Sequence, residues 1–301
     1  MSDQVWVAGE VLIDLIPNGD QYFAVVGGGP ANTAKALANL GLKTHFIDGI
    51  STDNYGQMAK AELLSANVLL DYAKYSSKPT CRAKIKLSKS GSAAYEFVIE
   101  GTATFDFSDL WLPDPQSLKP SLLHIGTLAT VIDPGASVLF EWAQSVAQVA
   151  PIVFDPNVRP AVLGDRDGYV RRVEKWVGIS SVVKVSDEDL NWLYPGKEIG
   201  LIINEFLEVG VQLVVVTLGD KGITAYRKNE VISVDAVKVV VADTIGAGDT
   251  VGAVLVEAIV NKGLDKLTGD MLKTMLSRAA KAAAITVSRT GANPPSKAEI
   301  D

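Results

Sequence analysis

The sequence predicts an α/β fold in which helices cover both faces of a mostly parallel sheet. Short, wholly apolar runs typical of buried strands recur along the chain, and helical patterns separate them. The length of 301 residues and the hydrophobic content of 48% suit one large domain, and no linker marks a second one. We therefore expect a single domain over residues 1–301, with strands at 5–9, 45–47, 122–125, 151–154, 181–184 and 213–217.

The spacing of apolar residues places helices between these strands. The first helix runs from Ala31 to Leu40 and is stopped by Gly41. The others are expected near 133–149, 165–178 and 198–208, followed by two helices rich in Ala and Val at 247–262 and 270–288. Ligands of such sheets bind outside the carboxyl ends of the strands, so polar residues at those ends are candidates for a site.

Two predicted hairpins interrupt the alternation of strands and helices. The first pairs 11–16 with 22–26 around Asn18-Gly19-Asp20, and the second pairs 81–87 with 94–99 around Ser90-Gly91-Ser92. Together they are expected to form a small side sheet, built from about 11–26 and 80–100, that emerges from the main domain. The alternative is that they add edge strands to the main sheet.

Composition excludes several classes of function. The net charge of −7 argues against a general nucleic-acid or membrane surface. Residues 1–4 lack a basic region, and the apolar run at 5–8 is too short for a signal or transmembrane segment. Cys81 is the only cysteine, and His45 and His124 are the only histidines, which excludes an intramolecular disulfide and a multi-histidine metal site. The chain also lacks the GxSxG elbow and the P-loop. We expect a soluble, cytoplasmic protein that binds neither nucleic acid nor membranes.

The segment 243–250, Asp-Thr-Ile-Gly-Ala-Gly-Asp-Thr, is the strongest chemical signal. It places a turn of small residues, with Asp249 inside it, at the start of an apolar helix. Unpaired N–H groups and the helix dipole attract anions there, and Gly246 and Gly248 leave the backbone open to a ligand. An anion cradle beside a proton-accepting carboxylate suits phosphoryl transfer to a hydroxyl. The structural alternative is an Asp that caps a helix after a glycine turn.

A second glycine-rich segment, 27–32, leads into the first long helix. Asn32 stands where a dinucleotide fingerprint has its third glycine, so a dehydrogenase is a weak alternative. The exposed backbone of Gly28 and Gly29, the Asn32 amide and the carboxylate of Asp14 suit hydrogen bonding to a polyol. Each of these residues, taken separately, also suits a turn, a cap or a solvated acid.

Polar residues follow two of the central strands. Arg159, in Asp-Pro-Asn-Val-Arg-Pro at 155–160, could pair with phosphate or sugar, or could be a solvated Arg in a turn. Lys184 or Ser186 would lie near nucleotide phosphates, with the acids at 187–189 near a hydrated metal ion. The alternative is that Ser186 caps a helix, with Asp189 completing a capping box.

Two later segments have weaker signals. Thr217 and Gly219 follow the strand 213–217 and could meet a nucleotide, although the same residues suit an ordinary turn between strands. Residues 286–295 end the last long helix, where Gly291 is the expected C-cap. Carbonyl groups freed at that helix end can bind a monovalent cation or water.

Taken together, these motifs resemble the ribokinase-like sugar kinases, also called the PfkB carbohydrate kinase family. The resemblance spans nearly the whole chain and rests on Gly28-Gly29-Pro30-Ala31-Asn32 and on 243–249, which matches the family's DTxGAGD signature in full. The segments 155–159 and 289–294 look most like fructokinases. The resemblance implies a three-layer α/β/α fold, with the side sheet as a lid over the sugar that also supports a homodimer.

The resemblance also implies ATP-dependent transfer of the γ-phosphoryl group to a sugar hydroxyl, with fructose to fructose 6-phosphate as the leading reaction. Asp249 would be the catalytic base, and the amides of Gly246, Ala247 and Gly248 would form the anion hole. The sugar would be bound by Asp14, Gly28, Gly29, Asn32 and Arg159. The nucleotide would be bound by Lys184, Ser186, Thr217 and Gly219.

Mg²⁺ is expected with ATP, and K⁺ is a candidate second ion. Its ligands would be Asp243, the carbonyl of Ile245 and carbonyls near Thr286, Arg289 and Gly291. Two departures bear on these ions: Ser186-Asp187-Glu188-Asp189 replaces the family's common Asn-x-x-Glu, and Pro295 stands where some members have a serine.

Other functions are compatible with the same motifs. Kinases for 2-keto-3-deoxygluconate, ribose or aminoimidazole riboside share the reaction class. A sugar-binding regulator that has lost catalysis belongs to a different class. The complete set of Asp249 and the three residues before it favours the enzyme.

Overall fold

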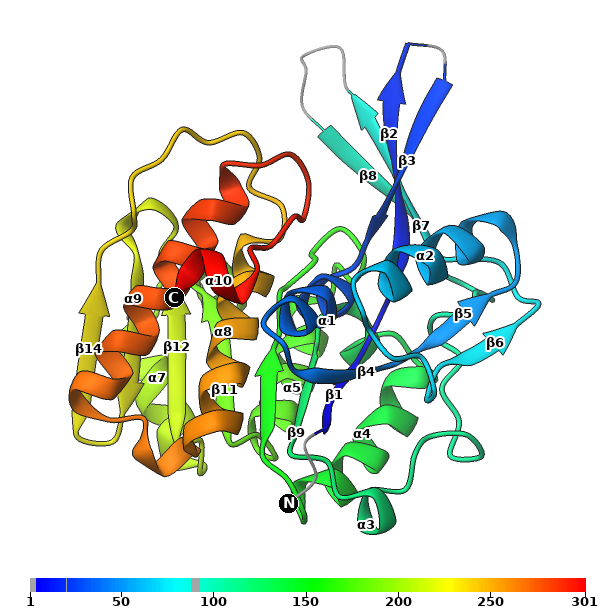
Figure 1. Ribbon diagram of the computed structural model, residues 1–301. Helices are drawn as coiled ribbons and strands as arrows, with labels where there is room; N and C mark the ends of the chain where they lie inside the picture. The colour runs from blue at the N-terminus through cyan, green and yellow to red at the C-terminus, as the bar shows by residue number, and fades with distance from the viewer. Residues whose placement is uncertain (1–3, 20, 88–92) are drawn as a thin grey trace.

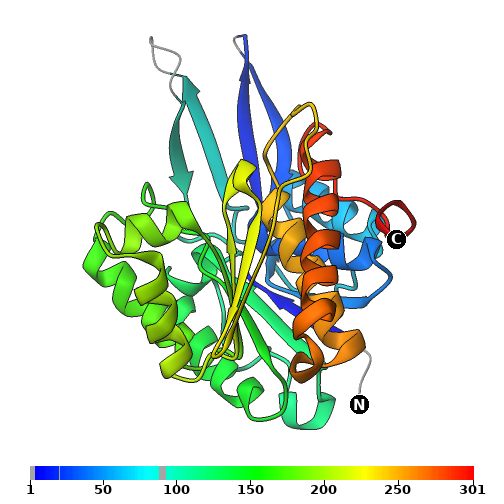
Figure 2. The same ribbon diagram turned by 90° about the vertical axis from the view of Figure 1, so that its left-hand side faces the viewer.

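Helices cover both faces of a central eight-stranded sheet in the computed structural model, which describes residues 4–19, 21–87 and 93–301 (Figures 1 and 2). The strand order is β14-β13-β12-β11-β10-β9-β1-β4. The six strands from β12 to β4 in this order are parallel to one another. At the other edge of the sheet, β13 pairs antiparallel with β12, and β14 pairs antiparallel with β13. The strands are β1 (Gln4–Ala8), β4 (Lys43–Ile47), β9 (Leu122–Gly126), β10 (Ile152–Asp155), β11 (Val182–Ser186), β12 (Leu213–Thr217), β13 (Ile223–Arg227) and β14 (Glu230–Val234).

The central strands are mostly apolar because both of their faces are buried. In β1, Val5 and Val7 belong to the core under α1, α8 and α9, whereas Trp6 and Ala8 belong to the core under the helices of the opposite face. Figure 2 shows these two helix layers on either side of the sheet. The helices are α1 (Gly29–Asn39), α2 (Asn54–Ser65), α3 (Pro115–Leu118), α4 (Gly135–Ala147), α5 (Arg166–Val177), α6 (Asp187–Leu193), α7 (Ile199–Glu208), α8 (Ala247–Lys262), α9 (Gly269–Val287) and α10 (Lys297–Ile300). The predicted fold class is confirmed.

A separate four-stranded side sheet projects from the main body (Figure 1). Its order is β3-β2-β7-β8, with the strands β2 (Leu12–Asn18), β3 (Gln21–Gly27), β7 (Arg82–Leu87) and β8 (Ala93–Val98). The alternative that these hairpins extend the main sheet is therefore wrong. The predicted turn at Ser90-Gly91-Ser92 lies outside the described residues. A further pair, β5 (Gly49–Ser51) and β6 (Lys74–Ser76), was not predicted.

The end of the last long helix differs from the sequence prediction. Gly291 does not cap it, because α9 ends at Val287 and Ser288 occupies the C-cap with an ordinary helical φ of −79°. Gly291 lies three residues further on with φ 68°, and its N–H donates to Asp243 instead. Within the described ranges, no helix is both long and apolar enough to cross a membrane.

Candidate active site

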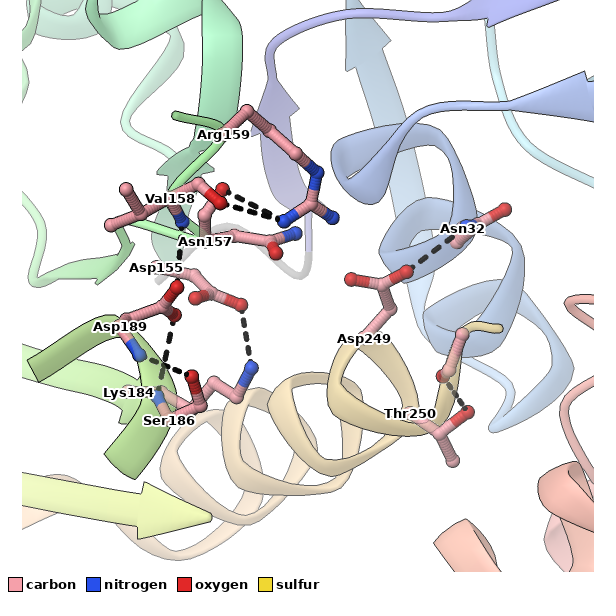
Figure 3. Close-up of polar contacts among 11 residues, drawn as sticks. Asn32, Asp155, Asn157, Val158, Arg159, Lys184, Ser186, Asp189, Asp249 and Thr250 are labelled. Atoms are coloured by element: carbon pink, nitrogen blue, oxygen red, sulfur yellow. Dashed lines mark hydrogen bonds and ion pairs between the residues drawn. The ribbon is translucent and has the colours of Figure 1, made fainter. Parts of the chain in front are cut away.

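Asp249 lies in the first turn of α8, facing the carboxyl ends of the central strands (Figure 3). Gly246 opens the helix in the left-handed conformation at φ 80°, which favours glycine. The Asp249 side chain is buried, and this burial raises its pKa to about 6, although the charge of Lys184 opposes the shift. Ala247 N–H donates only a long bond of 3.4 Å, to the Thr244 carbonyl. The turn therefore presents helix N–H groups next to a carboxylate that can titrate near neutral pH.

The glycine-rich start of α1 lies against Asp249. Asn32 Nδ2 donates to Asp249 Oδ2 at 3.0 Å, and Asn32 Oδ1 is buried without a partner among the described residues. A Cβ on Gly29 would lie 3.4 Å from Asp249 Oδ1 and 2.9 Å from Asn157 Nδ2. Gly28 has φ 109°, and a Cβ there would lie 2.4 Å from the Glu10 carbonyl oxygen. A side chain at Gly28 would collide with the Glu10 backbone, and one at Gly29 would crowd Asn157 beside the Asp249 carboxylate.

Asp14 and Arg159 bring opposite charges toward the same place. Asp14 is on β2 of the side sheet, and burial raises its pKa to about 6. The charge of Arg159 lowers the pKa of both Asp14 and Asp249, although by less than burial raises it. Figure 3 shows the Arg159 guanidinium extending over the space in front of Asp249, and its Nη1 donates to the Val158 carbonyl at 3.0 Å.

Lys184 and Asp155 form a buried ion pair behind the turn. Lys184 Nζ donates to Asp155 Oδ2 at 2.8 Å, and the two side chains are 6% and 2% exposed. The ammonium also touches α8, because a Cβ on Gly248 would lie 2.9 Å from Lys184 Nζ.

Ser186 caps the helix α6, which is the structural role that the sequence allowed for it. Its hydroxyl accepts a hydrogen bond from Asp189 N–H at 3.0 Å, and the Asp189 side chain completes a capping box at the start of α6. Asp189 Oδ1 also accepts from Val158 N–H at 2.9 Å, which ties the loop after β10 to α6. These acceptors are therefore occupied within the protein.

A cavity of about 1080 Å³ lies on one side of the α8 turn. Its lining includes Arg159 and all four residues predicted for the nucleotide: Lys184, Ser186, Thr217 and Gly219. Ala247 and Gly248 of the α8 turn also belong to the lining. Asp249, Asn32, Gly28, Gly29 and Asp14 lie outside this lining. The turn thus separates a large cavity from a small polar cluster, which is the arrangement that transfer between two substrates requires.

Residues 2–299 match the family described as pfkB family carbohydrate kinase. The chain belongs to this family. It is therefore a carbohydrate kinase, and the predicted family and enzyme class are confirmed.

Several named relatives agree with this assignment. A fructokinase of Rhizobium leguminosarum bv. trifolii is 34% identical over 250 residues, covering 81% of this chain and 76% of the relative. The Vibrio cholerae O395 fructokinase with fructose, ADP and a calcium ion is 26% identical, with a TM-score of 0.85 over 99% and 97% of the two chains. A double mutant of that enzyme holds fructose, ADP and a potassium ion, with 26% identity and a TM-score of 0.85 over 100% and 98%. The ATP-bound Xylella fastidiosa fructokinase, 23% identical with a TM-score of 0.92 over 100% and 97%, shares the fold.

Asp243 joins the two segments predicted for a monovalent cation in this kinase. Its carboxylate accepts from Ile245 N–H at 3.0 Å and from Gly291 N–H at 2.9 Å. Thr286 is buried and its hydroxyl bonds with that of Thr250 at 2.9 Å, while the Arg289 side chain turns away to pair with Glu299. Among the described residues, no group of three or more His, Cys, Asp or Glu side chains could hold a metal ion.

Sequence reasoning missed two residues beside the kinase's polar cluster. Thr127 has φ 56°, rare for a β-branched residue, and a Cβ on Gly29 would lie 2.8 Å from its Cγ2. Glu10 accepts hydrogen bonds from the Thr127 hydroxyl and from Ala129 N–H, and burial raises its pKa to about 7. Thr127 directly follows β9 and Glu10 lies two residues after β1, so the rule for strand ends that selected Arg159 could have selected them too.

Proposed function

We propose that this protein is an ATP-dependent fructokinase, which transfers the γ-phosphoryl group of ATP to a hydroxyl of fructose and forms fructose 6-phosphate. The observation that carries the proposal is the position of Asp249, buried at the start of α8 between the large cavity and the Asn32 cluster. The names of the relatives support fructose as the acceptor.

Asp249 is the proposed base. With a pKa of about 6 it is mostly ionised at pH 7 and above, so it can accept the proton of the attacking hydroxyl. The N–H groups of Gly246, Ala247 and Gly248 would stabilise the charge that develops on the transferred phosphoryl group, since helix N-termini favour anions.

The sugar is proposed to occupy the polar cluster on the Asn32 side of the turn. Asn32 Oδ1 needs a donor, which a sugar hydroxyl would supply. Asp14 offers a carboxylate, Arg159 offers charged N–H groups, and Gly28 and Gly29 keep the backbone within reach. This combination of acceptors and donors suits an acceptor with several hydroxyls.

ATP is proposed to occupy the large cavity, with its phosphates toward Gly248. Lys184, Ser186, Thr217 and Gly219 line the cavity near strand ends. The lining also includes the apolar side chains of Val237, Val239, Val241, Ala283 and Val287, which would pack against the adenine ring of ATP.

The donor sets fit both expected ions. Asp187 and Glu188 line the cavity and would hold the hydration shell of Mg²⁺, which neutralises phosphate charge when it is bound with ATP. Asp243, with the carbonyls of Ile245, Thr286, Arg289 and Gly291, is an oxygen-only set suited to K⁺, and Asp243 already draws these segments together.

The side sheet is proposed to be a lid. Asp14 on β2 connects it to the polar cluster, so closure would cover the sugar and exclude water. Tyr22 and Phe23 near the far end of the first hairpin are exposed, Phe23 by 62%, and support contact with a second copy of the chain. A cytoplasmic location remains part of this proposal.

A panel of sugars with ATP tests the proposed substrate. We expect fructose to have the highest kcat/KM, measured by coupled detection of ADP. A higher value for 2-keto-3-deoxygluconate, ribose or aminoimidazole riboside would replace fructose and keep the kinase. Sugar binding without turnover of any of these acceptors would favour the non-catalytic regulator.

A further inference from the structure

The buried pair of Lys184 and Asp155 lies directly behind the proposed base. Lys184 comes from β11 and Asp155 from the end of the neighbouring strand β10 (Figure 3). The second oxygen of Asp155, Oδ1, is buried without a partner in the described part of the chain. Burying two charges is costly, and apolar side chains often serve a core equally well, so a pair at this position calls for an explanation other than stability.

The ammonium of Lys184 explains why residue 248 is a glycine. Gly248 lies inside α8 and does not have a positive φ, so its backbone conformation suits any residue. A Cβ there would lie 2.9 Å from Lys184 Nζ, and Asp155 prevents this nitrogen from moving away freely. The ammonium is therefore held against the turn, one residue before Asp249.

The charged and polar groups around Asp249 come from several elements. Asn32 on α1, Lys184 on β11 and Arg159 after β10 each lower the pKa of Asp249, whereas Asp155 raises it. His124 on β9 lies near the pair, and burial lowers its pKa to about 4, so it is neutral at the pH of catalysis. Lys184 and Asp155 thus act on Asp249 with opposite signs, although they are partners of each other.

We propose that Lys184 is a positioning residue for phosphoryl transfer: anchored by Asp155 against Gly248, its ammonium supplies the fixed positive charge that maintains Asp249 as a base. The inference rests on the proposed function, because it takes Asp249 as the group that accepts the hydroxyl proton. It also gives Asp155 a role, which is to anchor the ammonium of Lys184. The two charges together still favour the ionised form of Asp249, because Lys184 lowers its pKa by more than Asp155 raises it.

Two substitutions that break the same ion pair test this proposal. Lys184→Met removes the positive charge, and Asp155→Asn removes the negative one. In the pH profile of kcat/KM, the acid-limb midpoint should rise by about one unit in Lys184→Met and fall by about one unit in Asp155→Asn. The side-chain oxygen that Asp155→Asn retains can still accept from Lys184 Nζ, so this variant keeps the anchor and removes only the charge. A pair that acts only through packing predicts no shift whose direction follows the charge removed.

The midpoint does not depend on how much enzyme is folded, so partial loss of protein leaves the test intact. If Lys184→Met does not fold, Asp155→Asn decides alone by the direction of its shift. Shifts in the same direction, or unchanged midpoints, would overturn the proposal.

The failure of the proposed function is distinguishable from failure of this inference. The profiles are recorded with whichever sugar the wild type phosphorylates, so a wrong substrate assignment does not affect them. If no sugar is phosphorylated, the proposed function fails. The titration of Asp249 is then followed by ¹³C NMR of labelled Asp carboxyl groups, assigned with Asp249→Asn, and the same opposite shifts are expected.

Discussion

The side-chain amide of Asn32 donates a 3.0 Å hydrogen bond to the carboxylate of Asp249, across a separation of 217 residues. This contact joins the glycine-rich segment at the start of α1 to the glycine-rich turn that opens α8. The donated bond favours the ionised carboxylate and leaves Asn32 Oδ1 available for a ligand.

Asn32→Ala should therefore impair both binding and catalysis. A hydrogen bond to a charged group is worth about 1.5–3 kcal/mol, so we expect kcat/KM for the sugar to fall by about 10- to 100-fold. The acid-limb midpoint should also rise, because a donor that favours ionised Asp249 is lost. Steady-state kinetics over a range of pH checks both effects. An unchanged midpoint would mean that Asn32 does not affect the pKa of Asp249.

Gly248→Ala should impair turnover, with Gly252→Ala as the matched control in the same helix. A Cβ at 248 would lie 2.9 Å from Lys184 Nζ, whereas a Cβ at 252 would have its nearest contact at 3.6 Å, with His124 Nε2. We expect kcat to fall at least about tenfold in Gly248→Ala, since displacing a fixed charge from a transition state costs about a kcal/mol or more. Gly252→Ala should stay within a few-fold of wild type. Equal effects in the two variants would contradict the role given to the Lys184 contact.

The affinity for the sugar should weaken as pH falls through about 6. Burial raises the pKa of Asp14 to about 6, and only the ionised carboxylate offers acceptors on both oxygens. The dissociation constant measured by calorimetry should therefore increase below that pH in the wild type. In Asp14→Asn the affinity for the sugar should be weaker at pH 8 and less dependent on pH. A pH dependence like that of the wild type would exclude Asp14 as its cause.

Folding stability should decrease as pH rises from 5 to 8. Burial raises the pKa of Glu10 from 4.5 to about 7 and that of Asp249 from 3.8 to about 6, so the folded state retains protons that the unfolded state releases. The stabilisation is present below the unfolded values and is lost as pH passes the folded ones. Urea unfolding at several pH values measures this slope. Glu10→Gln should flatten it, and an unchanged slope would mean that Glu10 does not titrate as described.

The fold was largely predictable because its strands and helices have strong local patterns. The expected helix at 247–262 coincides with α8, and the strand at 213–217 coincides with β12. The strand β14 was missed because it lies at the sheet edge, where its side chains are only half-buried or exposed. The side sheet was expected from its two hairpin patterns.

The site was predictable only in part because several of its contacts join distant residues. Gly248 was explained from the sequence by the approach of a ligand, but its neighbour is Lys184, 64 positions earlier in the chain. Ser186 caps α6 as its structural interpretation predicted and also lines the cavity, whereas its contact with a nucleotide stays a prediction. No local pattern marks the positive φ of Thr127, which depends on packing around Glu10.

The central claim is that Asp249 accepts the proton of the sugar hydroxyl, and Asp249→Asn tests it most directly. The substitution keeps the volume of the side chain and removes the basic oxygen. We expect kcat with ATP and fructose to fall by about 10²- to 10⁴-fold, the contribution typical of general-base catalysis, while calorimetry shows fructose still bound. A variant that binds fructose and turns over at the rate of the wild type would contradict the account.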